Sequence, residues 1–144
     1  MLRHVGKYEI RKLLGKGATG SVYLAADPFG QREVAVKVMD GAPGDPEEAR
    51  RQLRFFQTEA ALAGKLRHPH IVAILDAVVG EDSGHIAMEL VTGGDLSKYC
   101  TAQTLLPVPD VLQIGFKCCG ALEYAAKEGI VHRDIKPANI MVAS

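Results

Sequence analysis

The chain has 144 residues, of which 47% are hydrophobic and 24% charged, and its formal net charge at pH 7 is zero. This composition is typical of a globular protein, and the balanced charge gives no indication of a nucleic-acid-binding surface. No apolar run approaches the ~20 residues that a membrane-spanning helix needs, so we expect a cytoplasmic protein without a membrane segment in this span. The three cysteines are too few and too badly spaced for a disulfide framework or a zinc site.

Three strands are predicted near the start, at residues 8–14, 21–26 and 33–39. In the third strand the valines share one face, whereas Ala35 and Lys37 share the other. The glycine-rich stretch between the first two strands is followed by a strand and not by a helix, so it is predicted to be a hairpin tip. Backbone N–H groups at such a tip can approach phosphate oxygens. On the glycine pattern alone, phosphate binding and a flexible tip are equally good interpretations.

A helix is predicted from Asp45 to about Leu66. Asp45 is a suitable N-cap, and Pro46 suits the first helical position. Glu59 lies in the most apolar part of this helix, and a carboxylate that faces inward needs a partner. Lys37 shares its strand face with a small residue and is the predicted partner of Glu59. The alternative for Lys37 is an ordinary surface lysine.

Two further strands are predicted at residues 71–79 and 85–90, after Pro69 ends the helix. Two adjacent glycines then mark a break, and Asp95 is predicted to cap a short helix that runs through Tyr99. A second long helix is predicted from Asp110 to Lys127. Its apolar residues lie on nearly every side, as in a helix at the centre of a larger domain. The predicted order is therefore five strands with one inserted helix, a break, and then helices.

The octet from His132 to Asn139 concentrates chemistry in one short turn. The carboxylate of Asp134 can accept a proton from a hydroxyl, the ammonium of Lys136 can neutralise a transferring phosphoryl group, and the amide oxygen of Asn139 can ligate a divalent cation. The octet resembles the catalytic loop of protein kinases, in which His-Arg-Asp is followed by Asn after four residues.

Three earlier segments agree with this resemblance. In chain order they resemble the glycine-rich loop, the lysine strand and the strand-to-hinge segment of protein kinases; they are Gly15-x-Gly17-x-x-Gly20, Val34-Ala35-Val36-Lys37 and His85 to Asp95. The resemblance implies an α+β, bilobal kinase-like fold over residues 8–144. It implies a five-stranded antiparallel small lobe with one main helix at about 8–88, a hinge at about 89–94, and the first helices of the large lobe at 95–144.

The same resemblance implies ATP and Mg²⁺ as cofactors and a serine or threonine hydroxyl of a protein as the phosphoryl acceptor; it leaves the oligomeric state open. Asp134 would accept the hydroxyl proton, and Lys136 would stabilise the γ-phosphate. Lys37 and Glu59 would form the phosphate-binding pair, and Asn139 would bind Mg²⁺. The other expected nucleotide contacts are Leu14, Gly15, Lys16, Gly17, Ala18, Thr19, Gly20, Ser21, Val22, Ala35, Met88, Glu89, Val91, Asp95 and Met141. Met88 would also be a core residue, and for Asp95 a helix cap is an equally good interpretation.

No aspartate follows Asp134, so the chain lacks the Asp-Phe-Gly segment that supplies a second magnesium ligand in kinases. The resemblance covers about half of a complete kinase domain. We therefore expect this span alone to be inactive and, with the helix 110–127 uncovered, poorly soluble or partly molten.

Two other functions are possible. The first alternative is a nucleotide-binding regulatory module of the pseudokinase type, which the five polar residues of the predicted catalytic set disfavour. The second is a small-molecule kinase, which the run Asp134-Ile135-Lys136-Pro137 disfavours.

Overall fold

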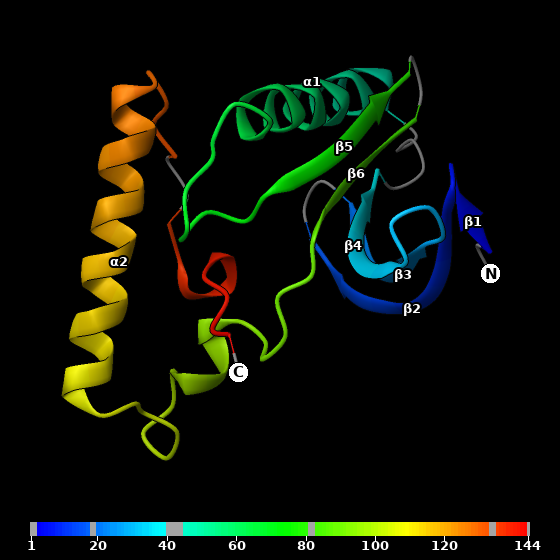
Figure 1. The fold of residues 1–144 in the computed structure, drawn as a ribbon. Coiled ribbons are helices and arrows are strands. Elements are labelled where there is room, and N and C mark those ends of the chain that lie inside the picture. The colour runs from blue at the N-terminus through cyan, green and yellow to red at the C-terminus, as the bar shows by residue number, and fades with distance from the viewer. Residues whose placement is uncertain (1–2, 18–19, 40–44, 81–82, 133–134, 144) are drawn as a thin grey trace. The chain divides into compact units, whose positions relative to one another are not determined.

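The computed structural model describes residues 3–17, 20–39, 45–80, 83–132 and 135–143. The chain divides into two compact units (Figure 1). The first unit comprises Met1–Lys65 and Ala73–Leu90, and the second comprises Leu66–Val72 and Val91–Ser144. The chain therefore passes between the two units three times, after Lys65, after Val72 and after Leu90.

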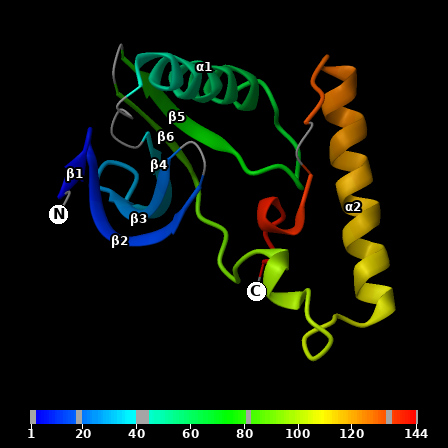
Figure 2. The same cartoon turned by 180° about the vertical axis from the view of Figure 1, so that it is seen from behind.

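The first unit is an antiparallel sheet with one long helix. In space the six strands follow the order β1-β2-β3-β4-β6-β5. The sheet curls through β2 and β3, and the helix α1 (Pro46–Ala63) lies along β5 in both views (Figures 1 and 2). The strands are β1 (His4–Val5), β2 (Tyr8–Lys16), β3 (Ser21–Asp27), β4 (Arg32–Val38), β5 (Ile74–Val79) and β6 (Gly84–Glu89).

The sheet has one strand more than the sequence predicts. Residues 4 and 5 form β1, which pairs with the start of β2 across a turn in which Gly6 has a φ of 56°. A strand of two residues is too short to show side-chain alternation, so the sequence carries no signal for it. Strand β5 begins at Ile74, three residues later than predicted, because Ile71 to Ala73 lie outside the ladder.

One face of the sheet forms the core of the first unit. The predicted alternation in β4 is confirmed, since Val34 and Val36 are fully buried on this face. The buried members of this core cluster are Tyr8, Ala25, Val34, Val36 and Ala87. Cross-strand partners share a face of a sheet, so the register places Ala35 and Lys37 on the opposite face.

Helix α1 is anchored through Phe56, which is fully buried. A Cβ atom on Gly84 of β6 would lie 2.9 Å from Cε1 of Phe56, so a larger residue there would displace the ring. The predicted cap of α1 is present, because Oδ1 of Asp45 accepts a hydrogen bond from the N–H of Glu47 at 3.0 Å. The helix ends at Ala63, slightly earlier than predicted.

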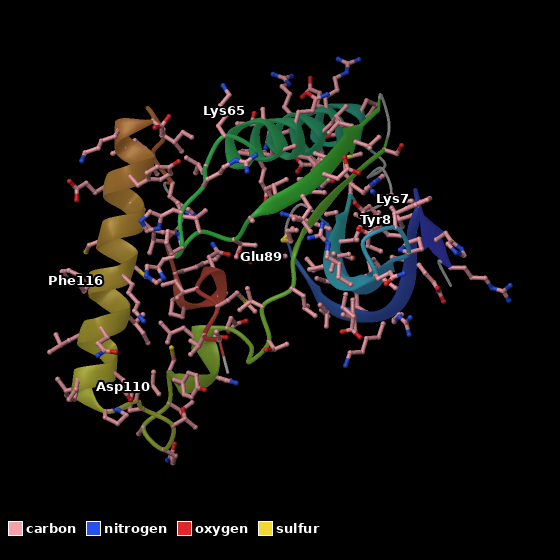
Figure 3. The ribbon with its side chains drawn as sticks, viewed as in Figure 1. Lys7, Tyr8, Lys65, Glu89, Asp110 and Phe116 are labelled. Carbon is pink, nitrogen blue, oxygen red and sulfur yellow. The ribbon has the colours of Figure 1, made fainter. Side chains whose placement is uncertain are left out.

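The second unit contains the long helix α2 (Val108–Lys127) and two short 3₁₀ helices, η1 (Leu96–Tyr99) and η2 (Pro137–Asn139). Helix α2 starts two residues earlier than predicted, because Pro109 fits in a first turn whose N–H groups have no partner within the helix. Its buried residues are Ala121 and Ala125. Phe116 is 83% exposed and projects from α2 away from the rest of this unit (Figure 3). Within the described residues, no helix is long and apolar enough to cross a membrane.

The segment between α1 and β5 is held by α2. The hydroxyl oxygen of Tyr124 accepts a hydrogen bond from the N–H of Arg67 at 3.1 Å. The ring of His68 lies 5.3 Å from the ring of Tyr124, and Nδ1 of His68 accepts a hydrogen bond from the N–H of His70. These contacts place Leu66–Val72 in the second unit, although the sequence predicts part of this stretch as strand.

We expect Tyr124→Phe to loosen this segment without removing the ring contact to His68. The lost hydrogen bond should lower the free energy of unfolding by about 1 kcal/mol. Urea unfolding of the complete natural protein measures this change, and Tyr99→Phe is a matched control because no contact of the Tyr99 hydroxyl is present among the described hydrogen bonds. Equal stability of Tyr124→Phe and wild type would show that the hydroxyl does not hold the segment.

Candidate functional site

The predicted pair of Lys37 and Glu59 is present in the structure. Nζ of Lys37 lies 2.9 Å from Oε1 and 2.8 Å from Oε2 of Glu59, so the ammonium contacts both oxygens of the carboxylate. The Lys37 side chain is only 15% exposed, whereas that of Glu59 is 43% exposed. A largely covered ammonium is costly without an opposite charge, and the Glu59 carboxylate supplies that charge.

Two elements position this ion pair. Strand β4 carries Lys37 between Val22 of β3 and Ile86 of β6, its cross-strand partners. Helix α1 carries Glu59 three residues after the buried Phe56, and residues at that spacing lie on neighbouring parts of one helix surface. The packing of Phe56 therefore determines where the Glu59 carboxylate can reach.

The sheet face of Lys37 also carries three apolar residues of the predicted site. Val22 pairs with Lys37, and Ala35 pairs with Met88, so these four side chains share one face. Ser21 does not join them, because it is 2% exposed and pairs with Val38 on the other face. Leu14 and Lys16 lie on the exposed part of β2.

The glycine-rich stretch is the tip of the β2–β3 hairpin, as predicted, and the N–H of Gly17 bonds the carbonyl oxygen of Gly20 at 2.8 Å. The fold itself requires Gly20, because a Cβ there would overlap the carbonyl oxygen of Val38. Gly15 differs, since a Cβ there would meet no described atom within 4 Å. Packing therefore does not explain why residue 15 is a glycine. Ala18 and Thr19 lie outside the described residues.

Glu89 lies at the end of β6 and forms hydrogen bonds with Ala73, the residue before β5. Its N–H donates to the carbonyl oxygen of Ala73 at 3.0 Å, and its carboxylate accepts from the N–H of Ala73 at 2.9 Å. The backbone contact predicted between Glu89 and a nucleotide can thus come only from the carbonyl of Glu89. Val91, the other predicted backbone contact, is half-buried in the second unit.

In the second unit the structure brings Asp95 and Met141 together. They face each other in an isolated antiparallel bridge, flanked by bonds from Leu96 N–H to Ile140 oxygen at 2.8 Å and from Val142 N–H to Gly94 oxygen at 2.9 Å. This bridge joins the segment after the glycine break to the segment after the octet.

Asp95 is the predicted helix cap. Its Oδ1 accepts bonds from the hydroxyl and the N–H of Ser97, at the start of η1. These two bonds, the hydroxyl bond first, lower the pKa of the Asp95 carboxyl from its usual value, and the ammonium of Lys98 adds to the effect. Because the pKa is lowered on folding, the cap stabilises η1 above the pKa of an unfolded aspartate. The stabilisation is lost as the pH falls through the folded pKa.

The octet is described only in part, and Asp134 lies outside the described residues. Lys136 directly precedes η2 and Asn139 is its last residue; the N–H of Asn139 donates a hydrogen bond to the carbonyl oxygen of Lys136 at 2.9 Å. Among the described residues, no group of three or more His, Cys, Asp or Glu side chains could hold a metal ion. Mg²⁺ that arrives with a nucleotide keeps phosphate and water ligands and needs only one or two protein oxygens, so the Asn139 amide fits such an ion.

Comparisons with known proteins agree on one family. A family model described as protein kinase domain matches residues 8–144. Serine/threonine-protein kinase PrkC of Bacillus subtilis is 39% identical over 137 residues, which are 95% of this chain and 21% of PrkC. Serine/threonine-protein kinase PknI of Mycobacterium tuberculosis is 38% identical over 141 residues, which are 95% of this chain and 23% of PknI.

Solved structures of protein kinases also match this chain. The crystal structure of the Mycobacterium tuberculosis PknI kinase domain superposes with a TM-score of 0.79 and 35% identity, covering 100% of this chain and 58% of that domain. The chain thus spans about a fifth of the curated PrkC and PknI proteins and little more than half of the solved kinase domain.

Proposed function

The chain belongs to the protein kinase domain family and has its fold, and we propose that it forms part of the catalytic domain of a serine/threonine protein kinase. In this proposal the γ-phosphate of ATP passes to a serine or threonine hydroxyl of a protein substrate. The observation that carries the proposal is the contact of the Lys37 ammonium with the Glu59 carboxylate at 2.8 Å. The serine/threonine kinases among the relatives support the same reaction.

Lys37 would hold the phosphates of ATP. Its ammonium has a fixed position before any nucleotide arrives, because both carboxylate oxygens of Glu59 contact it. A charge that is already in place stabilises negative phosphate oxygens without rearrangement. The open space beside Gly15 leaves room for phosphate oxygens to reach backbone N–H groups of the hairpin tip.

Separate contacts are assigned to the base and to the ribose. The apolar side chains of Val22, Ala35 and Met88 offer a surface to adenine, and the carbonyl of Glu89 and the backbone of Val91 would read its polar edge. Asp95 uses Oδ1 for its cap, so Oδ2 is the oxygen proposed to accept a ribose hydroxyl bond. Met141 is also proposed as a nucleotide contact, because it pairs with Asp95 in the antiparallel bridge.

The octet would supply the transfer step. We assign Asp134 to orient the acceptor hydroxyl and take its proton, and Lys136 to stabilise charge on the transferring phosphoryl group. Asn139 would bind Mg²⁺, whose chemistry is to neutralise charge on the phosphates of ATP. The residues up to Ser144 contain no Asp-Phe-Gly segment, so we propose that this span by itself does not transfer phosphate.

Phosphoryl transfer by the complete natural protein tests the proposal. With ATP labelled at the γ-phosphate and a mixed protein acceptor, we expect label on serine and threonine and none on tyrosine. Binding of ATP without any transfer would instead support the regulatory, pseudokinase-type module. Failure to bind ATP would overturn both functions.

A further inference from the structure

Ala73 and Glu89 form a reciprocal pair that differs from an ordinary strand pair. In an antiparallel sheet, two opposite residues that bond each other exchange both main-chain N–H···O=C bonds. Here Ile74 lies opposite Met88, so Ala73 and Glu89 are the next pair along the strands. The N–H of Glu89 bonds the carbonyl of Ala73 at 3.0 Å, but the N–H of Ala73 bonds Oε1 of the Glu89 side chain at 2.9 Å.

The carboxylate of Glu89 therefore occupies the place of its own main-chain carbonyl. This has two consequences. The N–H of Ala73 is satisfied although β5 has not yet begun, and the carbonyl oxygen of Glu89 is not needed for the bond to Ala73. Figure 3 shows Glu89 where β6 ends beside the start of β5.

The pair of Ala73 and Glu89 lies where the chain passes between the two units. Of the three passages between the two units, one follows Val72 and another follows Leu90. Ala73 directly follows the first of these passages, and Glu89 lies just before the second. One hydrogen-bonded pair therefore fixes the two points at which the chain enters and leaves this part of the first unit. The segment that leaves after Glu89 carries Val91.

We propose that the Glu89 side chain is a positioning and specificity-determining residue: by binding the N–H of Ala73 it holds the junction and leaves the Glu89 carbonyl to accept a hydrogen bond from the 6-amino group of adenine. The specificity role rests on the proposed function, because it requires ATP binding. The role of Glu89 in holding Ala73 does not depend on the proposed function. Without the carboxylate, the N–H of Ala73 would turn to the main-chain carbonyl of Glu89, the usual acceptor in an antiparallel pair, and so compete with adenine.

The test compares Glu89→Ala and Glu89→Gln in the complete natural protein. Glutamine keeps an oxygen at the end of a side chain of the same length, whereas alanine removes it. Glu123→Ala is the control, because it removes an exposed glutamate from α2 whose ion-pair partner within the described residues is Lys127 of the same helix. The readouts are hydrogen exchange at the Ala73 amide and the dissociation constants of ATP and of purine riboside triphosphate, which lacks the 6-amino group.

We expect Glu89→Ala to speed exchange at Ala73 by about tenfold and to reduce the preference for ATP over the purine analogue by about fivefold. Glu89→Gln should keep most of the slow exchange at Ala73 and most of the preference for ATP. Glu123→Ala should leave both unchanged. A general loss of stability would weaken the two nucleotides equally, so the change in preference identifies a specific role.

Unchanged exchange at Ala73 in Glu89→Ala would overturn the positioning role, and an unchanged nucleotide preference would overturn the specificity role. If the wild type binds neither nucleotide, the proposed function fails, and the specificity role fails with it. Faster exchange at Ala73 in Glu89→Ala would still support the hold on the junction in that case.

Discussion

Replacing Lys37 with methionine in the complete natural protein is expected to lower kcat/KM for phosphoryl transfer by at least about 10²-fold, the usual cost of removing one fixed group that stabilises developing charge. Methionine matches the length and the apolar stem of lysine, so the neighbours Val22 and Ile86 on the sheet keep their packing. The ammonium that Glu59 now holds is lost, and the Glu59 carboxylate becomes an unpaired negative charge beside the proposed phosphate position.

Lys65→Met is the matched control for this variant. Lys65 follows the end of α1, is exposed, and makes no ion pair among the described residues (Figure 3). Transfer by Lys65→Met should equal that of the wild type. If Lys37→Met retains full transfer, Lys37 does not act on the phosphates and the proposed function loses its main support.

A second variant separates binding from chemistry. Asp134→Asn removes the proposed proton acceptor but leaves Lys37 and its ion pair in place. We expect it to lower kcat by about 10²-fold or more while the dissociation constant of ATP stays close to that of the wild type. Lys37→Met should weaken ATP binding as well, so the two variants have different signatures. Retained kcat in Asp134→Asn would count against its role as proton acceptor.

The sequence was sufficient for features that depend on local patterns. The alternation of valines in β4 predicted that Val34 and Val36 share one face, and both are fully buried there, although Ala35 on the other face is buried as well. The apolar surroundings of Glu59 predicted that it faces Lys37. Asp45 and Asp95 cap their helices as the capping preferences of aspartate indicate. The two caps and the valine alternation are local, whereas the Lys37–Glu59 pair joins β4 to α1 and was indicated by the apolar residues around Glu59.

The features that sequence reasoning missed depend on contacts that the residues around either partner do not indicate. The attachment of Arg67 to Tyr124 joins positions 57 residues apart, and nothing near Arg67 indicates that its N–H needs a tyrosine hydroxyl. The carboxylate of Glu89 reaches Ala73 across 16 residues, at a position where only a backbone contact was predicted. A side chain that replaces a carbonyl in a strand pair leaves no periodic signal, since the residue type alone allows many partners.

Phe56→Ala is expected to destabilise the first unit by about 3–5 kcal/mol, the range for removing a buried phenylalanine ring. Phe56 is fully buried against Gly84, so the substitution leaves a cavity between α1 and β6. Glu59 lies one turn further along the same helix, so movement of α1 into the cavity would also shift the carboxylate that holds Lys37.

Phe55→Ala provides the control, because the neighbouring Phe55 is 60% exposed and its loss should change stability by no more than about 0.5 kcal/mol. The measurement is the shift in the urea midpoint of the complete natural protein for the two variants, together with their ATP affinities. Equal stability of the two variants would show that α1 is not anchored through Phe56. Unchanged ATP affinity in a destabilised but folded Phe56→Ala would show that the position of α1 does not control the Lys37–Glu59 pair.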